Sequence, residues 1–425
     1  MYCFLKYISL ALLLACITAR SEAEEAGDTA RYGSFTGHLK YEFDGRTLPE
    51  NSLYRTFIGS PSTDHGLETR LKFSWTPGKW DLMADYQLFA LAGDSLRLAD
   101  KLPGTALPVD RVVSDSRRWW NLTQRFGGDS RALVHRLDRL SIGHSSANFV
   151  WRFGRQAISW GNGLLFNPMD VFNPFDPAAV DKEYKTGDDM LYTQYLFSDG
   201  SDLQGVAVVR RNPVSGNVES DQSSLAIKYH GFLGLNEYDV LAARHYGEAL
   251  LGIGGNISAG GAVWRGDLTW SNTGGGVLSA VASASYSWTW SGMNVTGELE
   301  AFHNGFGQAD GAYAPDELAG NTALLERIAR GELYTLARNY LAASATLEVT
   351  PLLLLTPTLF MNLDDLSALA QVVLEYDLQQ DFLLRAALNV PVGPDGSEYG
   401  GIDSPIDGYY YSSGPGLFAQ LAWYF

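Results

Sequence analysis

Polar and apolar residues alternate through many segments of about ten residues, and this pattern limits the fold more than any other feature. In residues 278–290, one face is apolar and ends in Trp288 and Trp290. The other face carries mostly Ser and Thr and is interrupted by Val281. Residues 368–378 and 382–390 repeat the alternation. Because successive side chains of a strand point to opposite sides of a sheet, these segments predict two-faced β-strands.

The alternation favours a transmembrane barrel over a soluble β-sandwich. A sandwich turns its apolar face inward, whereas an apolar stripe that ends in two Trp residues is typical of a lipid-facing surface with an aromatic girdle. The polar face then lines a lumen. No segment after the N-terminal region reaches the roughly eighteen apolar residues that a membrane-spanning helix requires. A mean hydropathy of -0.09 agrees, because helical membrane proteins lie well above zero.

We therefore predict an all-β fold, a transmembrane antiparallel β-barrel with about 18 strands and 16 as the alternative. The predicted strands lie near residues 33–43, 67–76, 79–92, 133–143, 149–158, 190–197, 202–211, 221–230, 236–246, 249–258, 262–271, 278–290, 293–303, 339–349, 352–362, 366–377, 382–391 and 415–425.

The joints between these segments support the barrel, because the long ones all follow odd-numbered strands. They are residues 44–66, 93–132, 159–189, 304–338 and 392–414. Outer-membrane barrels have short periplasmic turns and long extracellular loops, so we expect these five joints outside the cell. Within the fourth, residues 321–330 predict a short helix with a cap at Asn321 or Thr322 and an end at Gly331.

The N-terminus has the pattern of an export signal. Lys6 precedes an apolar run from Tyr7 to Ile17, and Ser21-Glu22-Ala23 places small residues where a signal peptidase reads them. We predict a signal peptide over residues 1–23, which leaves 24–425 as a single barrel domain. Lipidation at Cys16 is the alternative, because Leu13-Leu14-Ala15-Cys16 resembles a lipobox. Both cysteines lie in this region, so no disulfide is expected in the mature chain.

The C-terminal strand carries a second sorting pattern. Phe425 ends the chain and shares a face with Trp423, Leu421 and Leu417. A final amphipathic strand that ends in Phe resembles the assembly signal of bacterial outer-membrane β-barrels. The resemblance implies insertion by the barrel-assembly machinery into the outer membrane, with outer-membrane lipids and lipopolysaccharide as surroundings. A net charge of -17 argues against nucleic acid as a partner.

The most distinctive segment is residues 152–177. It combines Gly154-Arg155-Gln156, a Trp160-Gly161 turn and Asn173-Pro174-Phe175-Asp176. It resembles a loosely characterised group of porin-like outer-membrane proteins that share these three motifs. Its repeated Asn-Pro units form stiff turns. We therefore predict that 159–189, with Asp170 and Asp176, folds inward as a constriction; packing against the wall is the alternative.

Charges on the predicted lumen faces are segregated along the chain. Basic residues come mainly from the first eleven strands and include Arg152 and, if a bulge at Gly154 swaps the two faces of the strand, Arg155. Acidic residues come from predicted strands thirteen to sixteen: Glu298, Glu300, Glu348, Glu375 and Asp377. Asp81, Asp85, Asp267 and Arg385 depart from this order. We expect these two sets to line the pore and to create a transverse field, or else to pair with neighbouring strands.

Aromatic residues in the long joints are candidates for stacking on sugar rings, as in sugar-selective porins. The candidates are Trp119, Trp120, Phe166, Phe172 and Phe175. Packing within the loops is the alternative.

These features predict a porin-like channel for passive diffusion of small hydrophilic solutes or ions. A structural, assembly or export barrel for polysaccharide or lipid is the second hypothesis, and an outer-membrane hydrolase is the third. The sequence contains neither a Gly-x-Ser-x-Gly elbow nor a metal-spaced His pair. We therefore expect no enzymatic activity, no metal and no cofactor.

Overall fold

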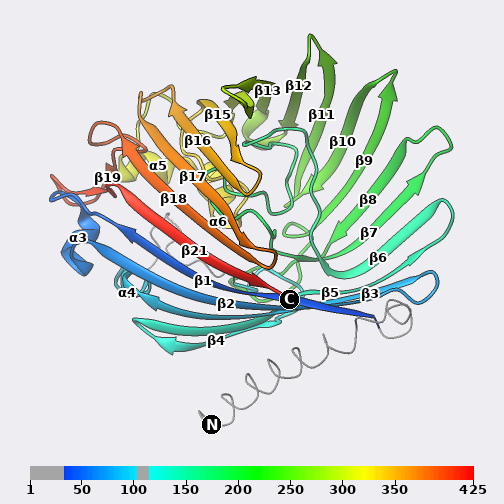
Figure 1. Ribbon diagram of the computed structural model, residues 1–425, viewed down its shortest axis with the longest axis horizontal. Helices are drawn as coiled ribbons and strands as arrows, with labels where there is room; N and C mark the ends of the chain where they lie inside the picture. The colour runs from blue at the N-terminus through cyan, green and yellow to red at the C-terminus, as the bar shows by residue number, and fades with distance from the viewer. Residues whose placement is uncertain (1–32, 103–113) are drawn as a thin grey trace.

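The computed structural model describes residues 33–102 and 114–425 and forms a closed antiparallel β-barrel of 18 strands (Figure 1). The first strand, β1 (Ser34–Arg46), pairs with β2 (Ser62–Trp75) on one side and with the last strand, β21 (Gly416–Tyr424), on the other. The ring therefore has no free edge. This confirms the predicted fold and the strand number of 18. The predicted signal peptide, its cleavage site and Cys16 lie outside the described residues.

Each remaining strand of the ring pairs with its neighbours in chain order. These strands are β3 (Trp80–Gly93), β5 (Arg131–Ser145), β6 (Phe149–Gln156), β7 (Asp188–Leu196), β8 (Asp202–Val208), β9 (Ser224–Leu233), β10 (Asn236–His245), β11 (Glu248–Ala259), β12 (Ala262–Ser271), β13 (Val277–Trp290), β14 (Met293–His303), β15 (Asn339–Thr350), β16 (Leu353–Asn362), β17 (Ala368–Gln379) and β18 (Phe382–Val392).

The two faces of the strands follow the predicted alternation. On β13, the side chains of Leu278 and Trp290 are 52% and 57% exposed on the outside, whereas Ser279 and Ser283 are buried on the inside. The outside is therefore the apolar surface that faces lipid, and the inside carries the polar side chains.

One short strand, β4 (Thr123–Gly128), was not predicted. It pairs with residues 131–136 of β5. It forms because β6 pairs with only residues 140–145 of β5 and so leaves residues 131–139 of β5 without a partner strand on that side. β4 satisfies the backbone groups that would otherwise form an open edge.

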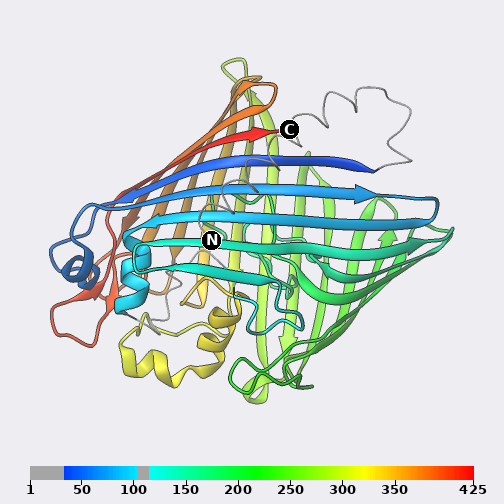
Figure 2. The ribbon, with the colours of Figure 1, turned by 90° about the horizontal axis from the view of Figure 1, so that it is seen from below.

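The five long connections leave the same end of the barrel, as predicted. Small elements lie within four of them: α3 (Leu53–Ile58), α4 (Asp94–Lys101) with β4, α5 (Pro315–Gly320) with α6 (Thr322–Arg330), and the hairpin β19 (Ile402–Asp403) and β20 (Tyr410–Tyr411). Figure 2 shows α3, α4, α5 and α6 gathered at that end. A single 3-10 turn, η1 (Thr273–Gly275), joins β12 to β13. None of the described helices is long and apolar enough to span a membrane.

The helix predicted at 321–330 is confirmed as α6. The side chain of Asn321 accepts a hydrogen bond from the backbone N–H of Leu324, and Gly331 ends the helix in the left-handed conformation at φ 73°. Both ends therefore follow ordinary capping chemistry.

The C-terminal residue closes the seam of the ring. The backbone N–H of Gly37 donates to the carbonyl of Phe425 over 2.8 Å, and the N–H of Phe425 donates to the carbonyl of Gly37 over 3.0 Å. The ring of Phe425 lies so close to Gly37 that a Cβ there would come within 2.8 Å of it. Phe425 therefore has a structural role in addition to its predicted role as an assembly signal.

We expect deletion of Phe425 to lower the amount of inserted barrel, because it removes both seam hydrogen bonds and the terminal aromatic ring. The measurement is the heat-modifiable fraction in outer membranes. Leu417→Ala is the matched control, because Leu417 is also an outward side chain of β21 and is 49% exposed. It pairs with Gly45, at the opposite end of the β1–β21 seam from Phe425. Equal amounts of folded barrel after deletion and in wild type would contradict the prediction.

Candidate functional site

The connection between β6 and β7, residues 157–187, lies inside the ring of strands (Figure 1), and we call it the strap. It leaves and rejoins adjacent strands, yet it contacts walls far from both. Its partners include Asp267 on β12, Glu300 on β14, Gln371 on β17 and Lys40 on β1. The strap therefore crosses the interior of the barrel and returns, and it corresponds to the predicted inward fold of 159–189.

Glu300 holds the strap against β14. Its carboxylate accepts backbone hydrogen bonds from Leu164 over 2.7 Å, from Leu165 over 3.0 Å and from Phe166 over 2.6 Å. The Glu300 residue is 1% exposed. Three charge-assisted hydrogen bonds compensate for its loss of water and fix one turn of the strap in place.

Asn162 makes a second attachment, to β12 and β10. Its backbone N–H donates to Asp267 Oδ2 over 2.7 Å, and its side-chain Nδ2 donates to Asp267 Oδ1 over 2.8 Å and to Asp239 Oδ2 over 3.1 Å. The preceding Gly161 adopts φ 92°. This conformation is readily available only to glycine, and it turns Asn162 toward the wall.

Apolar side chains of the strap pack against the wall between these attachments. Phe166 stacks on Phe302 of β14 with ring centroids 4.8 Å apart. Met169 and Phe172 are almost fully buried in a cluster that includes Leu241 of β10. Both packing and polar contacts therefore hold the strap, as expected for a stiff loop.

The predicted stiff turns are present in the middle of the strap. The backbone N–H of Asp170 donates to the carbonyl of Asn167 over 3.1 Å, and that of Ala178 donates to Asp176 Oδ1 over 2.9 Å. Asn173 adopts the left-handed conformation at φ 57°. The Asn167-Pro168 unit thus forms a local turn, whereas the second turn lies at Asp176-Pro177, directly after the Asn173-Pro174 unit.

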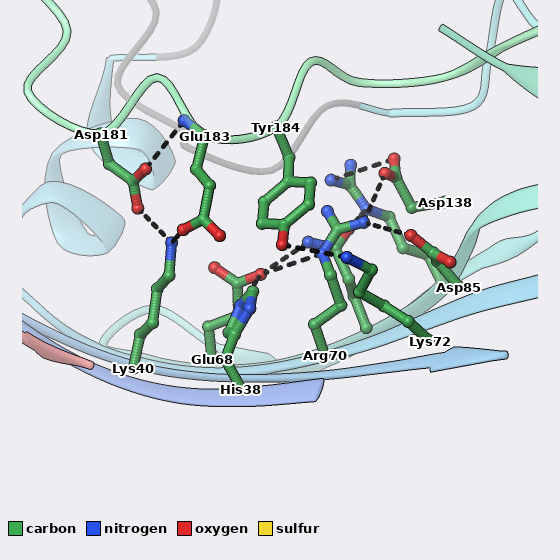
Figure 3. A network of polar contacts seen from close by, with 12 residues as sticks. His38, Lys40, Glu68, Arg70, Lys72, Asp85, Asp138, Asp181, Glu183 and Tyr184 are labelled. Atoms are coloured by element: carbon green, nitrogen blue, oxygen red, sulfur yellow. Dashed lines mark hydrogen bonds and ion pairs between the residues drawn. The ribbon is translucent and has the colours of Figure 1, made fainter. Parts of the chain in front are cut away.

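The returning part of the strap is held by charge (Figure 3). Lys40 Nζ donates to Asp181 Oδ2 and to Glu183 Oε2, both over 2.6 Å. Gln420 Nε2 also donates to Asp181, over 2.8 Å, and the hydroxyl of Tyr424 donates to Glu183 over 2.9 Å. Although burial opposes ionisation, these contacts, led by Lys40, lower the pKa of Asp181 to about 2. Asp181 is therefore ionised throughout the physiological range.

Tyr184 lies next to this group and covers a buried ion network on the wall (Figure 3). The guanidinium of Arg70 lies 4.1 Å from the centre of the Tyr184 ring. Arg70 Nη1 is 3.1 Å from both Asp85 and Asp138, so the cation is shared by two carboxylates. The strap therefore ends over an arginine whose charge two wall carboxylates already neutralise.

Several of the predicted pore-lining charges contact side chains of nearby strands. Arg152 Nε is 2.9 Å from Asp81 on β3, and Glu375 Oε1 is 2.6 Å from Arg385 on β18. Glu348, which is exposed near the short-turn end of β15, accepts from Asn294 over 2.8 Å. Of the four residues that depart from charge segregation, Asp81, Asp85 and Arg385 form ion pairs with nearby strands, whereas Asp267 binds Asn162 of the strap. A transverse field remains a prediction, and Arg152 and Glu375 favour the local alternative.

The other predicted acidic residues differ in their surroundings. Glu298 is half-buried on β14, and Asp377 is exposed on β17. Asp170 is buried in the strap and pairs with Lys185. Burial raises the pKa of Asp170 to about 6 and also raises the pKa of Asp176.

Arg155 does not line the interior surface, and this corrects the expectation. Its side chain is fully buried, and its guanidinium donates to Asp189 over 2.8 Å, to Asp115 over 3.0 Å and to the carbonyl of Trp120 over 2.6 Å. The pairing register sets it opposite Leu140, which is 41% exposed on the outside. Arg155 therefore ties residues 114–122 to the wall.

Four of the five predicted sugar-stacking aromatics are packing residues. Trp119 and Trp120 stack on each other at 5.4 Å, and Trp120 meets the outward ring of Phe153 at 5.7 Å. Phe166 and Phe172 are buried between strap and wall. Phe175 borders the larger cavity of the structure, whereas Phe166, although almost fully buried, borders a smaller one. This supports the packing alternative for the other four.

Sequence reasoning missed several residues that hold the strap: Lys40, Asp181, Glu183, Asp239 and Gln371. The inward positions of Lys40 and Asp239 follow from alternation on their strands. The strap residues that Lys40 and Asp239 bind cannot be predicted from alternation, because a loop of this length can reach many positions on the wall.

Glu398 joins two extracellular connections above the strap. Its carboxylate accepts from the hydroxyl of Tyr340 over 2.6 Å, from Asn362 Nδ2 over 2.8 Å and from the backbone N–H of Leu336 over 2.8 Å. Burial raises the pKa of Glu398 to about 7, although these donors favour the ionised form. The packed arrangement is therefore sensitive to pH near neutrality.

No family model matches this sequence, and no curated protein matches it. Solved structures are similar. Wzi, an outer-membrane protein involved in group 1 capsule assembly in Escherichia coli and described as a carbohydrate-binding β-barrel, has a TM-score of 0.50 and 11% identity, covering 97% of this chain and 87% of Wzi. OccAB3 of Acinetobacter baumannii has a TM-score of 0.52 and 10% identity, covering 93% and 99%.

A BenF-like porin from Pseudomonas fluorescens Pf-5 has a TM-score of 0.52 and 9% identity, again covering 93% of this chain and 99% of the porin. At these identities the likeness shows the fold alone. The chain has the fold of porin-like outer-membrane β-barrels.

We expect Glu300→Ala to loosen the strap, because it leaves three buried N–H groups without an acceptor. Hydrogen exchange at Leu164–Phe166 should accelerate by about tenfold or more, which corresponds to the loss of at least about 1.4 kcal/mol. Glu298→Ala is the matched control, since Glu298 lies two residues away on the same inner face of β14 and accepts no hydrogen bond among the described residues. Unchanged exchange in Glu300→Ala would show that packing alone holds this turn.

Because of Glu398, we also expect amide hydrogen exchange in the two connections to depend on pH. Burial raises the pKa of Glu398 in the folded protein above the ordinary value of 4.5, so folding takes up a proton between about pH 4.5 and 7. The packing of the two extracellular connections should therefore lose stability as pH rises through this window. Exchange at Leu336, corrected for its intrinsic rate, should be faster at pH 8 than at pH 5, and Glu398→Gln should remove the difference. An equal difference in the variant would assign the effect to another group.

Proposed function

We propose that the protein is a channel in the bacterial outer membrane for passive diffusion of small hydrophilic solutes or ions, and that the strap forms its constriction. One observation carries the proposal: a stiff polar loop crosses an interior whose wall side chains are polar and charged. A barrel that serves only as an anchor has no need of such an interior, whereas a water-filled path requires one.

The attachment of the strap supports a fixed constriction rather than a mobile lid. Glu300 and Asp267 hold one side of it, and Lys40 holds the other, so both ends of its crossing are fastened. A constriction held at both sides keeps a constant width, which suits diffusion with size selection.

A barrel for polysaccharide or lipid assembly is the second candidate, and one observation favours it. Wzi, which takes part in capsule assembly, shares the fold over most of this chain. Single-channel current separates the two candidates, because an assembly barrel whose strap fills the interior conducts no ions. The hydrolase hypothesis gains no supporting observation.

We expect replacement of residues 164–178 by a short Gly-Ser linker to raise single-channel conductance by roughly twofold or more, because it removes the central obstruction. Planar bilayers containing the purified barrel give the measurement. Deletion of 213–217 is the control, since it shortens an exposed connection between β8 and β9 that is not part of the strap. Unchanged conductance in the folded linker variant would exclude the strap as the constriction, and no current in either protein would favour the assembly role.

A further inference from the structure

A separate cavity of about 660 Å³ lies above the strap on the extracellular side. Its floor is the strap at Phe175, Asp176 and Lys185, and its sides are residues 328–336 and the 393–415 connection. Its volume falls within the range of small-molecule binding sites, about 300–1,000 Å³. None of the strap attachments to Glu300, Asp267 or Lys40 borders it. It therefore shares the strap with the proposed constriction but lies apart from the contacts that fasten the strap to the wall.

We propose that this cavity is a binding site for a neutral saccharide. Six aromatic rings line it, from Phe175, Tyr184, Tyr246, Tyr334, Tyr399 and Tyr411. Among the described residues, the rings of Tyr334 and Tyr399 contact neither another ring nor a cation, and Tyr334 is 40% exposed. The electron-rich face of such a ring attracts the C–H groups on the flat side of a sugar.

Another ring of the cavity is not available for stacking. Tyr246 lies between two guanidinium groups, with Arg210 at 4.5 Å and Arg330 at 4.0 Å from its ring centre. It acts as a spacer that positions both arginines at the cavity surface. The stacking surface therefore comes from the two extracellular connections and from Phe175.

Planar polar groups supply the hydrogen bonds that a sugar needs. Arg117 borders the cavity, and its side chain has no hydrogen-bond or ion-pair partner among the residues that the structure describes. Arg330 Nε is buried without a partner, in a side chain that is only 10% exposed. Guanidinium groups can bind two adjacent hydroxyls at once, and the free edge of Asp176 can accept from a third.

The charge balance favours a neutral ligand over an ion. Arg210 is 2.7 Å from Asp188, Arg118 is 2.5 Å from Asp115, and Lys185 pairs with Asp170. Arg330 also contacts Glu326, over 2.8 Å. Among the described residues, these pairs leave Arg117 as the unpaired cation of the lining, and the carboxyl groups of Asp176 and Glu398 in the same lining offset its charge. The unused donors and acceptors of the pairs can still bind hydroxyl groups.

The inference goes beyond the proposed function, because a saccharide site in this cavity requires no current through the barrel. The test is isothermal titration of the purified, detergent-solubilised barrel with three neutral trisaccharides, namely maltotriose, cellotriose and xylotriose, and with the anionic trigalacturonate. At least one neutral trisaccharide should bind. Tyr334→Ala and Tyr399→Ala should each weaken that binding by roughly five- to tenfold, as expected for loss of an aromatic contact.

Two variants separate stacking from folding. Tyr399→Phe keeps the ring and should retain the affinity. Tyr409→Ala removes a similarly exposed ring from the same connection, and because Tyr409 does not border the cavity, it should have no effect. Heat modifiability confirms that each variant is folded.

Three results would overturn the proposal: no heat with any neutral trisaccharide, binding of trigalacturonate alone, or equal affinity in wild type, Tyr334→Ala and Tyr399→Ala. The channel is tested separately by conductance. Saccharide binding without current would reject the channel and keep the site, and current without saccharide binding would do the reverse.

Discussion

The closed backbone ladder is the constraint on which the rest of the structure depends. In a hydrocarbon environment every backbone N–H and C=O needs a partner within the protein, and a sheet achieves this only when its first and last strands pair. β1 and β21 do so over nine residue pairs from His38 to Arg46, and Phe425 extends the seam to Gly37. The same requirement explains β4, which fills the edge of β5 that the short β6 leaves open.

Closure also creates the interior that the strap uses. Because alternation sends apolar side chains outward, the inner face is left with carboxylates, amides and basic groups that need partners away from bulk water. The backbone of the strap supplies several of them. Glu300 takes three N–H groups of the strap, and Asp267 takes the backbone and side chain of Asn162. Wall and strap thus satisfy each other, and a change on either side leaves buried polar groups unpaired.

Local pairing governs the charges of the wall more than their segregation along the chain does. Arg70 lies between Asp85 and Asp138, and Arg152 is paired with Asp81. An ion pair on adjacent or next-but-one strands costs less than two isolated charges in a narrow lumen. Asp81, Asp85 and Arg385, three of the residues that interrupt the segregation, therefore neutralise charges of nearby strands, and a net field across the lumen depends on the charges that remain unpaired.

The sequence by itself determined the strand number, the direction of each strand, its two faces and the end at which the long connections lie, because period-two alternation is a local property. It also located the stiff segment that became the strap. Only the tertiary structure decided which wall residues the strap contacts. It also decided that Arg155 donates hydrogen bonds to residues 114–122, and that Trp119 and Trp120 pack on the outward ring of Phe153. The physical reason is separation along the chain: Leu164 and Glu300 are 136 residues apart, and barrel closure alone brings them together.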